Sequence, residues 1–475
     1  MRVLLQISVI LLVILGGGEG FAQPDTLWTR SYRVGPTSFC NRLISTPDGG
    51  FALGIQSDNN SNADWGLVKV DSTGRRQWSR IYHSEDTLGT LDDVFEGLAV
   101  APDGSYYITG RWNNNRAQLM RVDSIGREIW SNNYEIRDDD EFLHVCVAQD
   151  GNPVCAGTTV LDCNLVKISS DGDVLWHHAY GGRGTDLFLR VISTRDGGFL
   201  AVGWTTSFGG MKAYAVKTDR DGNQEWARTF NENREGHVFI SVVESPEGGY
   251  LAVGNGEFNG SLRLYWVRMT ADGDSLWSGV LEHENDGAGF LLDATYAPNG
   301  GFLIIGESRE YEYASYRLDR NGEIMWRLDV GDYPDQEWFE TVLTLDDGSY
   351  AIGGRKGNPP VDDQAWLVRT KPDPEFNSVV LLDPAFPSAF RVASPYPNPF
   401  NSTIRLSYSL PTPSQTSIRI YNQLGHQVAV IYEGRAQQAG PYAVTWDASG
   451  QTTGVYFCKV VAGGNSATMK VVLVK

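Results

Sequence analysis

A repeat of about 50 residues, marked by tryptophan, constrains this chain more than any other feature. Seven tryptophans recur at intervals of 46 to 52 residues, and all but the first follow a glycine by four residues, as in "VDSTGRRQW" at 70–78. A second recurring motif, a short turn sequence such as "PDGG" at 47 or "PEGG" at 246, precedes each of the six later tryptophans. It occurs once more as "DDGS" at 346. Such a period indicates that one supersecondary unit is copied along the chain. The tryptophans are Trp28, Trp78, Trp130, Trp176, Trp226, Trp277 and Trp326.

Each copy reads as four short strands. In the first copy these are "FCNRLIST", "FALGI", "WGLVKVD" and "RQWSRIY", separated by the turns "PDGG" and "STG" and by a variable loop. Asp-Gly pairs between alternating apolar residues are strong hairpin signals, because glycine accepts a positive φ without steric cost. Four-stranded units at this spacing predict a β-propeller. We therefore expect an all-β chain with a seven-bladed β-propeller over residues 23–376.

The two ends of the repeat region complement each other. The seventh copy stops at "AWLVRTKPDPEF" without its fourth strand, whereas "DTLWTRSY" at 25–32 is such a strand with no copy before it. We expect strand 25–32 to complete the last blade and close the ring, which removes an open sheet edge. The Gly-to-Trp stretch is then a turn between the third and fourth strands, and Trp78 fills space between neighbouring blades.

The amino terminus has the features of a signal peptide over residues 1–22. Arg2 precedes an apolar run at 3–15, and small residues end with Ala22 before Gln23. The run is too short for a membrane span, and no other stretch has the roughly 18 apolar residues that a span needs, so we expect no transmembrane segment. The net charge of -19 argues against nucleic acid and anionic lipid as partners.

The carboxy-terminal part has a different pattern. Residues 377–395 contain several prolines and no repeat signal, which indicates a linker. Short alternating strands separated by Gly/Pro turns then fill residues 396–475. About 80 residues of this pattern predict a small immunoglobulin-like β-sandwich.

The motifs of residues 396–475 are specific. "YPNPFN" at 396, "IYNQLGHQV" at 420, "AGPYAVTWDASG" at 439, "TGVYF" at 453 and the terminal "KVVLVK" occur in this order. This region resembles the carboxy-terminal sorting domain of cargo for the type IX secretion system of Bacteroidetes-like bacteria. The resemblance implies passage through the periplasm, recognition by the outer-membrane translocon, and a secreted or outer-surface location. The matching positions are Pro397, Asn398, Pro399, Phe400, Gly425, Gly440, Trp446, Asp447, Gly454, Tyr456 and Lys475.

One face of the propeller is expected to carry the variation. The glycine turns are short and nearly uniform, whereas the second loops and the links between copies differ. The links are often acidic just before an aromatic residue, so Asp93, Asp140, Asp186 and Asp335 are expected to surround the channel mouth. Such a ring would suit Ca²⁺ or a cationic ligand. The alternative is that these are solvated turn residues that make local hydrogen bonds.

Aromatic residues add a second group of candidates on this face. Trp112, Trp204, Tyr311 and Tyr313 are placed to stack on sugar rings or to anchor a protein partner, unless they pack between blades. No HExxH, GxSxG or phosphate-binding loop occurs, so no catalytic residue, cofactor site or metal-ligand motif is indicated.

The five cysteines are an odd number without CxxC spacing, which argues against a zinc site. Counting outward from a two-residue turn at Asp150-Gly151 places Cys146 opposite Cys155. An export route favours a disulfide between them, and free buried thiols are the alternative.

Three functions fit this pattern. The first is an exported propeller that acts as a binding or adhesion scaffold, with a glycan or protein ligand on the variable face. The second is an extracellular propeller enzyme, a glycan hydrolase or lyase, with carboxylates at the mouth. The third is a structural component of the cell surface.

Overall fold

The computed structural model describes residues 25–58, 63–82, 94–112, 116–136, 141–159, 161–230, 236–258, 261–281, 290–297, 300–309, 312–330, 336–357, 363–373, 391–392, 400–410, 414–437 and 440–475. All secondary-structure elements in these residues are strands. The chain divides into two compact units, Met1–Val379 and Val380–Lys475. Each unit is described by itself below.

The first unit contains seven four-stranded antiparallel sheets, here called blades 1 to 7. Blades 1 to 3 are formed by β2 (Thr37–Ser45), β3 (Phe51–Asp58), β4 (Ala63–Val70), β5 (Arg76–Tyr82); β6 (Val94–Val100), β7 (Tyr106–Trp112), β8 (Arg116–Val122), β9 (Glu128–Tyr134); and β10 (Glu141–Val147), β11 (Pro153–Thr158), β12 (Cys163–Ile168), β13 (Val174–Tyr180). Blades 4 to 6 are formed by β14 (Asp186–Ser193), β15 (Phe199–Thr205), β16 (Lys212–Thr218), β17 (Gln224–Phe230); β18 (Val238–Glu244), β19 (Tyr250–Phe258), β20 (Ser261–Met269), β21 (Ser275–Val280); and β22 (Leu291–Tyr296), β23 (Phe302–Arg309), β24 (Glu312–Leu318), β25 (Ile324–Val330).

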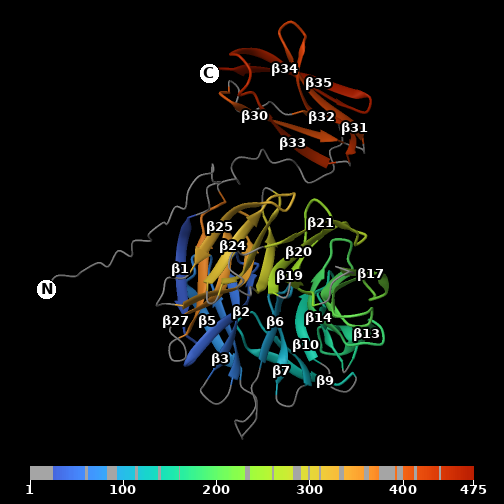
Figure 1. Cartoon of the computed structure of the whole chain (residues 1–475). Helices are drawn as coiled ribbons and strands as arrows, with labels where there is room; N and C mark the ends of the chain where they lie inside the picture. Colours follow the sequence, from blue (N-terminus) through green and yellow to red (C-terminus); the bar gives the residue numbers. More distant parts are fainter. Residues whose placement is uncertain are drawn as a thin grey trace, which may run out of the picture. The chain divides into compact units, whose positions relative to one another are not determined.

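Blade 7 joins the two ends of the propeller sequence. It is formed by β26 (Gln336–Thr344), β27 (Tyr350–Gly357), β28 (Gln364–Thr370) and, as its outer strand, β1 (Thr26–Tyr32). Strand β1 runs antiparallel to β28, from Thr26 opposite Thr370 to Tyr32 opposite Ala365. Figure 1 shows the blue β1 beside the orange strands of the last repeat.

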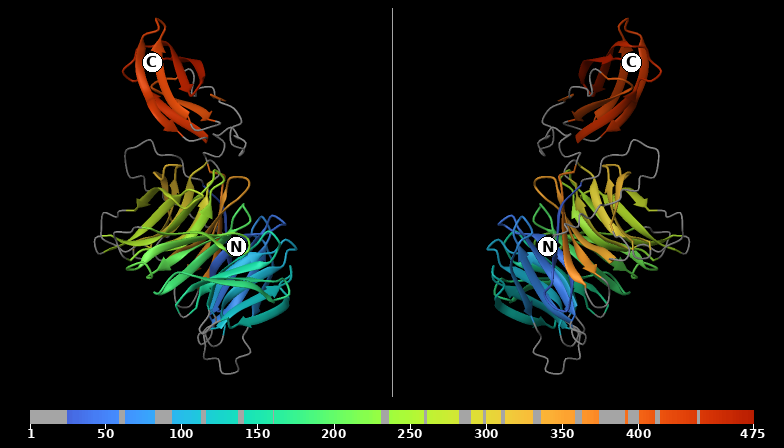
Figure 2. Two further views of the ribbon diagram at one scale, coloured as in Figure 1. Left: turned by 90° about the vertical axis from the view of Figure 1, so that its right-hand side faces the viewer. Right: turned by 90° about the vertical axis from the view of Figure 1, so that its left-hand side faces the viewer.

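The blades form a closed ring. The first strand of each blade contacts the first strand of the next, and β2 contacts β26. In both views of Figure 2 the strands follow one another through the first unit from blue through green to orange. The seven first strands, β2, β6, β10, β14, β18, β22 and β26, therefore surround the ring axis. The expectation of a seven-bladed propeller is confirmed.

The repeated glycine and tryptophan meet across blade boundaries. The turn glycine between the third and fourth strands has a positive φ, and the tryptophan of the preceding blade lies against it. A Cβ added at Gly126, for example, would stand 2.6 Å from the Trp78 ring. The motif is thus a spacer for blade packing. The contacts are Trp28 with Gly74, Trp78 with Gly126, Trp130 with Gly172, Trp176 with Gly222, Trp226 with Gly273 and Trp277 with Gly322.

A tyrosine at the end of the outer strand adds a hydrogen bond at four of these boundaries. Tyr180 Oη donates to the carbonyl oxygen of Gly222 at 2.7 Å. The equivalent pairs are Tyr32 with Gly74, Tyr82 with Gly126 and Tyr134 with Gly172. A buried hydroxyl that finds a partner in the next blade makes the boundary specific as well as apolar.

Each blade also has a basic residue in its third strand that reaches the first hairpin turn. Five of these residues make ion pairs with the turn aspartate: Lys69 with Asp48, Arg121 with Asp103, Lys167 with Asp150, Lys217 with Asp196 and Arg369 with Asp347. The turn "PNGG" of blade 6 has no carboxylate. There Arg317 pairs instead with Asp373, beyond the last strand, at 3.0 Å, and Tyr350 Oη donates to the same carboxylate at 2.8 Å.

The second unit is a sandwich of two antiparallel sheets. One sheet contains β29 (Arg391–Val392), β30 (Thr403–Leu410) and β33 (Gly440–Asp447); the other contains β31 (Ser414–Asn422), β32 (Gln427–Gln437), β34 (Gly454–Ala462) and β35 (Asn465–Leu473). Both sheets contribute to one apolar core. The Trp446 ring lies 5.6 Å from Phe400 and 5.2 Å from Tyr456 in this core. Three motif residues are therefore core residues of the sandwich.

The disulfide prediction is wrong, because Cys146 and Cys155 are free thiols. Ala148 N bonds to Asn152 O, so the hairpin loop has three residues, 149–151, rather than two. Cys146 then faces Val154, and Cys155 faces Val145. A shift of one residue turns a side chain to the other face of a strand, so the two sulfur atoms lie on opposite faces of blade 3.

Candidate functional site

Several predicted site residues cannot be placed. Asp93, Asp140, Asp335 and Tyr311 lie outside the described residues. Trp112 is the last residue of β7, and its side chain is likewise outside the description. The proposed carboxylate ring at the variable face therefore stays a prediction for these positions.

Asp186 is described, and the prediction that it lines an open mouth is wrong. It is fully buried at the start of β14. Its carboxylate accepts hydrogen bonds from the Thr205 hydroxyl, from Ser207 Oγ at 2.8 Å and from Gly182 N at 2.9 Å. Both oxygen atoms of the Asp186 carboxylate therefore accept hydrogen bonds from the protein. Asp186 therefore holds the link into blade 4 in place.

The two described aromatic candidates differ from each other. Tyr313 is buried, and its ring packs edge-on against Trp338 at 6.4 Å, so it is a packing residue rather than a surface platform. Trp204 lies near the end of β15 opposite Leu187 and is half-buried. Trp204 therefore remains available as a stacking residue.

A second group of polar residues lies deeper, on the first strands of the blades. Each of these strands has a β-bulge at the same place, one residue after its buried Cys, Phe or Leu. A bulge re-aims the side chains that follow it. We call the residues directly after the bulge the axial ring; they are Arg42, Gly97, His144, Arg190, Ser241, Asp293 and Thr341.

Asp293 is the centre of one half of the axial ring. Its carboxylate accepts from Arg190 Nη2 at 3.1 Å, Ser241 Oγ at 2.7 Å and Thr341 Oγ1 at 3.0 Å. Arg190 belongs to blade 4, Ser241 to blade 5 and Asp293 to blade 6, so this carboxylate links three successive blades. The Arg190 side chain keeps 17% of its exposure, whereas that of Asp293 keeps only 2%.

The other half of the axial ring lacks such a centre. Gly97 has no side chain, and it lies between Arg42 and His144 in the order of the blades. Among the described residues, Arg42 Nε and His144 Nδ1 of this half, and Arg190 Nε of the Asp293 half, are buried nitrogen atoms without a hydrogen-bond partner. Buried polar atoms are rarely left unpaired, and each costs about 1–3 kcal/mol. This half is therefore polar but not satisfied by the protein.

The residues at the bulge, one position before the axial ring, are polar on one side of the propeller and apolar on the other. Glu340, Asn41 and Glu96 occupy this position in blades 7, 1 and 2, whereas blades 3 to 6 have apolar residues there: Leu143, Leu189, Ile240 and Leu292. Burial raises the pKa of Glu96, and the Arg42 and Arg111 guanidinium groups oppose this rise. Burial also raises the pKa of Glu340, against the Arg355 and Arg42 guanidinium groups.

Neighbouring positive groups lower the pKa values of side chains in the half of the axial ring that contains Gly97. Burial lowers the pKa of Arg42, and the Arg190 guanidinium lowers it further. Burial holds the pKa of His144 well below its usual range, and Arg190 and Arg42 add to this effect. The His144 ring is therefore neutral at pH 7. The three groups lie close enough to interact with one another electrostatically.

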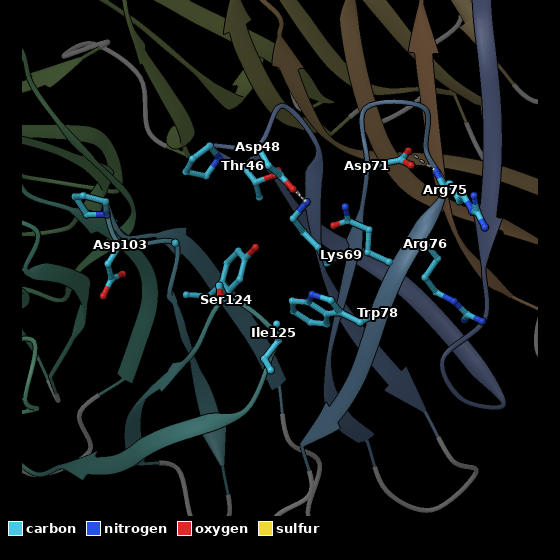
Figure 3. A pocket seen from close by; sticks show the side chains of 15 residues that line it. Thr46, Asp48, Lys69, Asp71, Arg75, Arg76, Trp78, Asp103, Ser124 and Ile125 are labelled. Atoms are coloured by element: carbon cyan, nitrogen blue, oxygen red, sulfur yellow. Dashed lines mark hydrogen bonds and ion pairs between the residues drawn. The ribbon is translucent and has the colours of Figure 1, made fainter.

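An open groove of ≈ 710 Å³ lies between blades 1 and 2, on the side of the hairpin turns (Figure 3). It is lined by Asp48, Lys69, Trp78, Asp103 and Ile125, among others. Lys69 points to Asp48 in this view, and their ion pair belongs to the set that recurs in five blades. The charged groups of the groove thus support the fold, and the axial ring is the stronger candidate site.

The described residues contain no group of three or more His, Cys, Asp or Glu arranged for a metal ion. Because Asp93, Asp140 and Asp335 are outside that set, the suggested Ca²⁺ site stays a prediction. No described segment forms a helix of the length and apolarity that a membrane span requires.

Sequence reasoning missed the axial ring because its residue type varies from blade to blade, with only Arg occurring twice, at Arg42 and Arg190. The signal that marks them is positional: they stand two residues after the aromatic or small apolar residue of the first strand, as in "FEG" at 95, "FLH" at 142 and "FLR" at 188. An alignment of the seven copies on that residue would have shown a column that is mostly polar.

Comparison with known proteins identifies the second unit. Residues 394–475 match the family described as "Secretion system C-terminal sorting domain". Residues 394–475 are a type IX secretion sorting domain. The sorting domain indicates export of the chain to the cell surface or the medium and recognition by the secretion system. No curated protein matches the chain.

Solved structures resemble the fold. A protein from Lactobacillus plantarum is 10% identical, with 86% of this chain and 99% of that chain covered and a TM-score of 0.45. Drosophila Plexin A in complex with Semaphorin 1b is 11% identical, with 74% and 88% covered and a TM-score of 0.43. The polysaccharide lyase Uly1 is 9% identical, with 76% and 94% covered and a TM-score of 0.44.

Proposed function

We propose that this protein is an exported binding scaffold that acts at the cell surface or in the medium and binds its ligand at the ring axis. The sorting domain of residues 394–475 supports the export. The axial ring supports the binding, because it gathers charged and polar groups from six blades around the ring axis, where the Arg190 side chain is partly exposed.

The observation that carries this proposal is the charge at the bulge positions of blades 7 and 2. Leu143, Leu189, Ile240 and Leu292 show that apolar residues fill the same position in four other blades. Burying Glu340 or Glu96 instead costs free energy, because a carboxylate loses its hydration there. Residues that lower stability in this way concentrate at functional sites. The polar side of the axis is therefore better explained by a ligand than by folding.

A thermal-shift screen of the full chain without residues 1–22 tests the proposal. The panel contains neutral, acidic and amino sugars and divalent cations. A ligand that binds the folded state raises the melting temperature. We expect Glu340→Gln to weaken the shift, while Glu225→Gln, a carboxylate change on the outer strand β17, leaves it unchanged. A shift that both variants retain would place the ligand elsewhere, and the absence of any shift would contradict a binding scaffold for these ligands.

One observation favours the second candidate, an enzyme that acts on glycans. A general acid needs a pKa above the usual carboxyl range, and burial raises the pKa values of Glu96 and Glu340 in that direction. The two functions are separated by product formation. An enzyme releases new reducing ends from a polysaccharide, and Glu340→Gln abolishes this release while binding persists. A scaffold binds without product.

A further inference from the structure

Another open groove, also of ≈ 710 Å³, lies on the outer side of the propeller where blade 7 meets blade 1. One wall is the outer strand β1 of blade 7, and the other is the turn between β4 and β5 of blade 1. Figure 3 shows the side chains of Arg75 and Arg76 extending away from Trp78. Four exposed arginines line this space, which we call the arginine groove: Arg30, Arg33, Arg75 and Arg76.

The arginine groove differs in charge from the rest of the chain. The chain has a net charge of -19, yet none of the described residues that line the groove is acidic. Among the described residues, no ion pair joins Arg30, Arg75 or Arg76 to a carboxylate. The Asp71 carboxylate of the same turn accepts hydrogen bonds from Thr73 N and Arg75 N, so it is held by the turn itself. The groove therefore concentrates positive charge without a matching anion.

A second blade boundary shows how the same position can be neutralised. Arg228 and Arg30 are equivalent, because each stands two residues after the repeated tryptophan of its outer strand. Arg228 pairs with Asp274, the residue after the turn glycine of the next blade, at 3.7 Å. Arg30 lies over the turn at Gly74, but the residue after that glycine is Arg75. Like charges that face each other destabilise a fold, so folding alone favours an acidic residue here.

The other side chains of the groove are suited to hydroxyl groups. Ser31, Thr73 and Gln364 also line it, and each can donate and accept hydrogen bonds. Tyr32 is buried, and its hydroxyl already donates to Gly74 O. The described lining thus has no exposed apolar anchor, whereas protein partners usually bring an apolar and aromatic interface core. A hydroxyl-rich anion fits this lining better than a peptide.

We propose that the arginine groove binds an acidic polysaccharide, with its carboxylate or sulfate groups at the guanidinium groups of Arg30, Arg75 and Arg76. A guanidinium group donates parallel hydrogen bonds that match such oxyanions. A nucleic acid duplex carries a charge about every 1.7 Å and would extend over the acidic remainder of the chain. The groove lies on the outer strands, away from the ring axis, so this inference goes beyond the proposed function.

Isothermal titration calorimetry of the full chain without residues 1–22, at low salt, tests the ligand class. The probes are polygalacturonate, which carries carboxylates; dextran sulfate, which carries sulfate esters; neutral dextran; and a short DNA duplex. We expect an acidic polysaccharide to bind at least about tenfold more tightly than dextran or DNA, and the two acidic probes show which oxyanion is preferred. Added salt should weaken the binding, because exposed charges are screened.

Matched variants locate the binding. Arg75→Asp places a carboxylate where Asp274 stands in blade 5, and it should weaken polysaccharide binding about tenfold or more through repulsion. Arg220→Asp makes the same change of charge in the third turn of blade 4, at a side chain that is 81% exposed, and should keep wild-type affinity. Melting temperatures verify folding. If Arg75→Asp does not fold, Arg76→Gln removes one charge and should weaken binding about two- to fivefold.

Each remaining outcome overturns the inference. Equal losses in Arg75→Asp and Arg220→Asp would mean that only the overall charge matters. Dextran that binds as tightly as the acidic polymers would remove the role of the arginines, and tighter binding of DNA would assign the groove to nucleic acid. The absence of binding by both acidic polymers would leave the groove without its ligand. Polysaccharide binding that is lost in Glu340→Gln would place the ligand at the axis, which supports the proposed function instead.

Discussion

The Trp78 indole of blade 1 lies against Gly126 of blade 2 so closely that a Cβ at Gly126 would stand 2.6 Å from Trp78 Cζ3. Gly126 has a φ of 76°, in the left-handed region. The same turn therefore needs glycine for two separate reasons, its backbone conformation and the ring that it receives. Because each tryptophan packs on the following copy, every blade helps to complete its neighbour.

Gly126→Ala should lower the free energy of unfolding by about 2–5 kcal/mol, the sum of left-handed strain and overpacking against Trp78. Gly49→Ala is the matched control, since Gly49 has a φ of 78° but nothing within 4 Å of an added Cβ. It should cost only the strain, about 1–2 kcal/mol. Urea unfolding measures both values. Equal losses in the two variants would show that the Trp78 contact adds nothing.

Asp373→Asn should destabilise the propeller strongly. Arg317 and Asp373 are both buried, and removal of one partner from a buried pair costs about 3–5 kcal/mol. Asp347→Asn breaks the corresponding pair of blade 7, whose aspartate is 49% exposed, and should cost about 1 kcal/mol or less. The comparison is made by chemical denaturation of the full chain. A similar cost for both changes would contradict a special role for Asp373.

Tyr180→Phe should cost about 1 kcal/mol, because it removes the 2.7 Å hydrogen bond to Gly222 O and little apolar contact. Blade 4 has Phe230 at the equivalent position of its outer strand. The reverse change, Phe230→Tyr, should therefore increase stability by a similar amount through a bond to Gly273 O. Both shifts can be read from urea midpoints. Destabilisation by Phe230→Tyr would mean that this boundary has no room for the hydroxyl.

Stability should fall as the pH drops from about 4 toward 2. Partial burial raises the pKa of Asp48, but hydrogen bonds from Lys69 and Thr46 outweigh this effect and lower the pKa to about 2. An unfolded aspartate titrates near about 3.9, so the stabilisation is complete above that pH and is lost as the folded carboxylate becomes protonated. Asp103, Asp150, Asp196 and Asp347 have lowered pKa values as well.

The measurement is the free energy of unfolding between pH 2 and 5 for the wild type and for Asp48→Asn. The variant should have a shallower slope, because its turn no longer releases a proton on folding. A wild-type stability that stays constant across this window would refute the prediction.

The native protein should react slowly with thiol reagents, and the unfolded chain should expose five free thiols. All five cysteines are unpaired. Burial raises the pKa of Cys146 and of Cys458 to about 12, which leaves little thiolate at neutral pH. Alkylation followed by intact mass spectrometry, without a reductant, counts the thiols. Three alkylated thiols instead of five would reveal a disulfide after all.

The repeat made the architecture predictable from sequence. Copies of one strand order, spaced by about 50 residues, leave few folds besides a propeller, and the confirmed sorting domain has motifs in a fixed order. The unmatched strand at 25–32 also pointed to its place, because an incomplete last copy needs a fourth strand. These conclusions depend on spacing and order, which a sequence displays directly.

The site was less predictable, for two physical reasons. The axial ring depends on a bulge, and a bulge changes which side chains face the axis without changing the alternation that a strand pattern reveals. The hairpin at Asp150 likewise has a three-residue loop where a two-residue loop fits the same sequence, and this reversed the face of Cys155. Asp186 was misjudged because its partners are Thr205, the last residue of β15, and Ser207, in the loop that follows this strand.

The residues that close the propeller ring also bear on which products of translation can be exported. The outer edge of blade 7 is complete only when β1 meets β28, and Arg317 finds its partner only when Asp373 is present. The sorting domain begins at residue 394, after all of these residues. A translation product that ends early therefore lacks its export address whenever it lacks a closed ring. Every chain that carries the sorting domain through its own synthesis thus also carries the residues that close the ring.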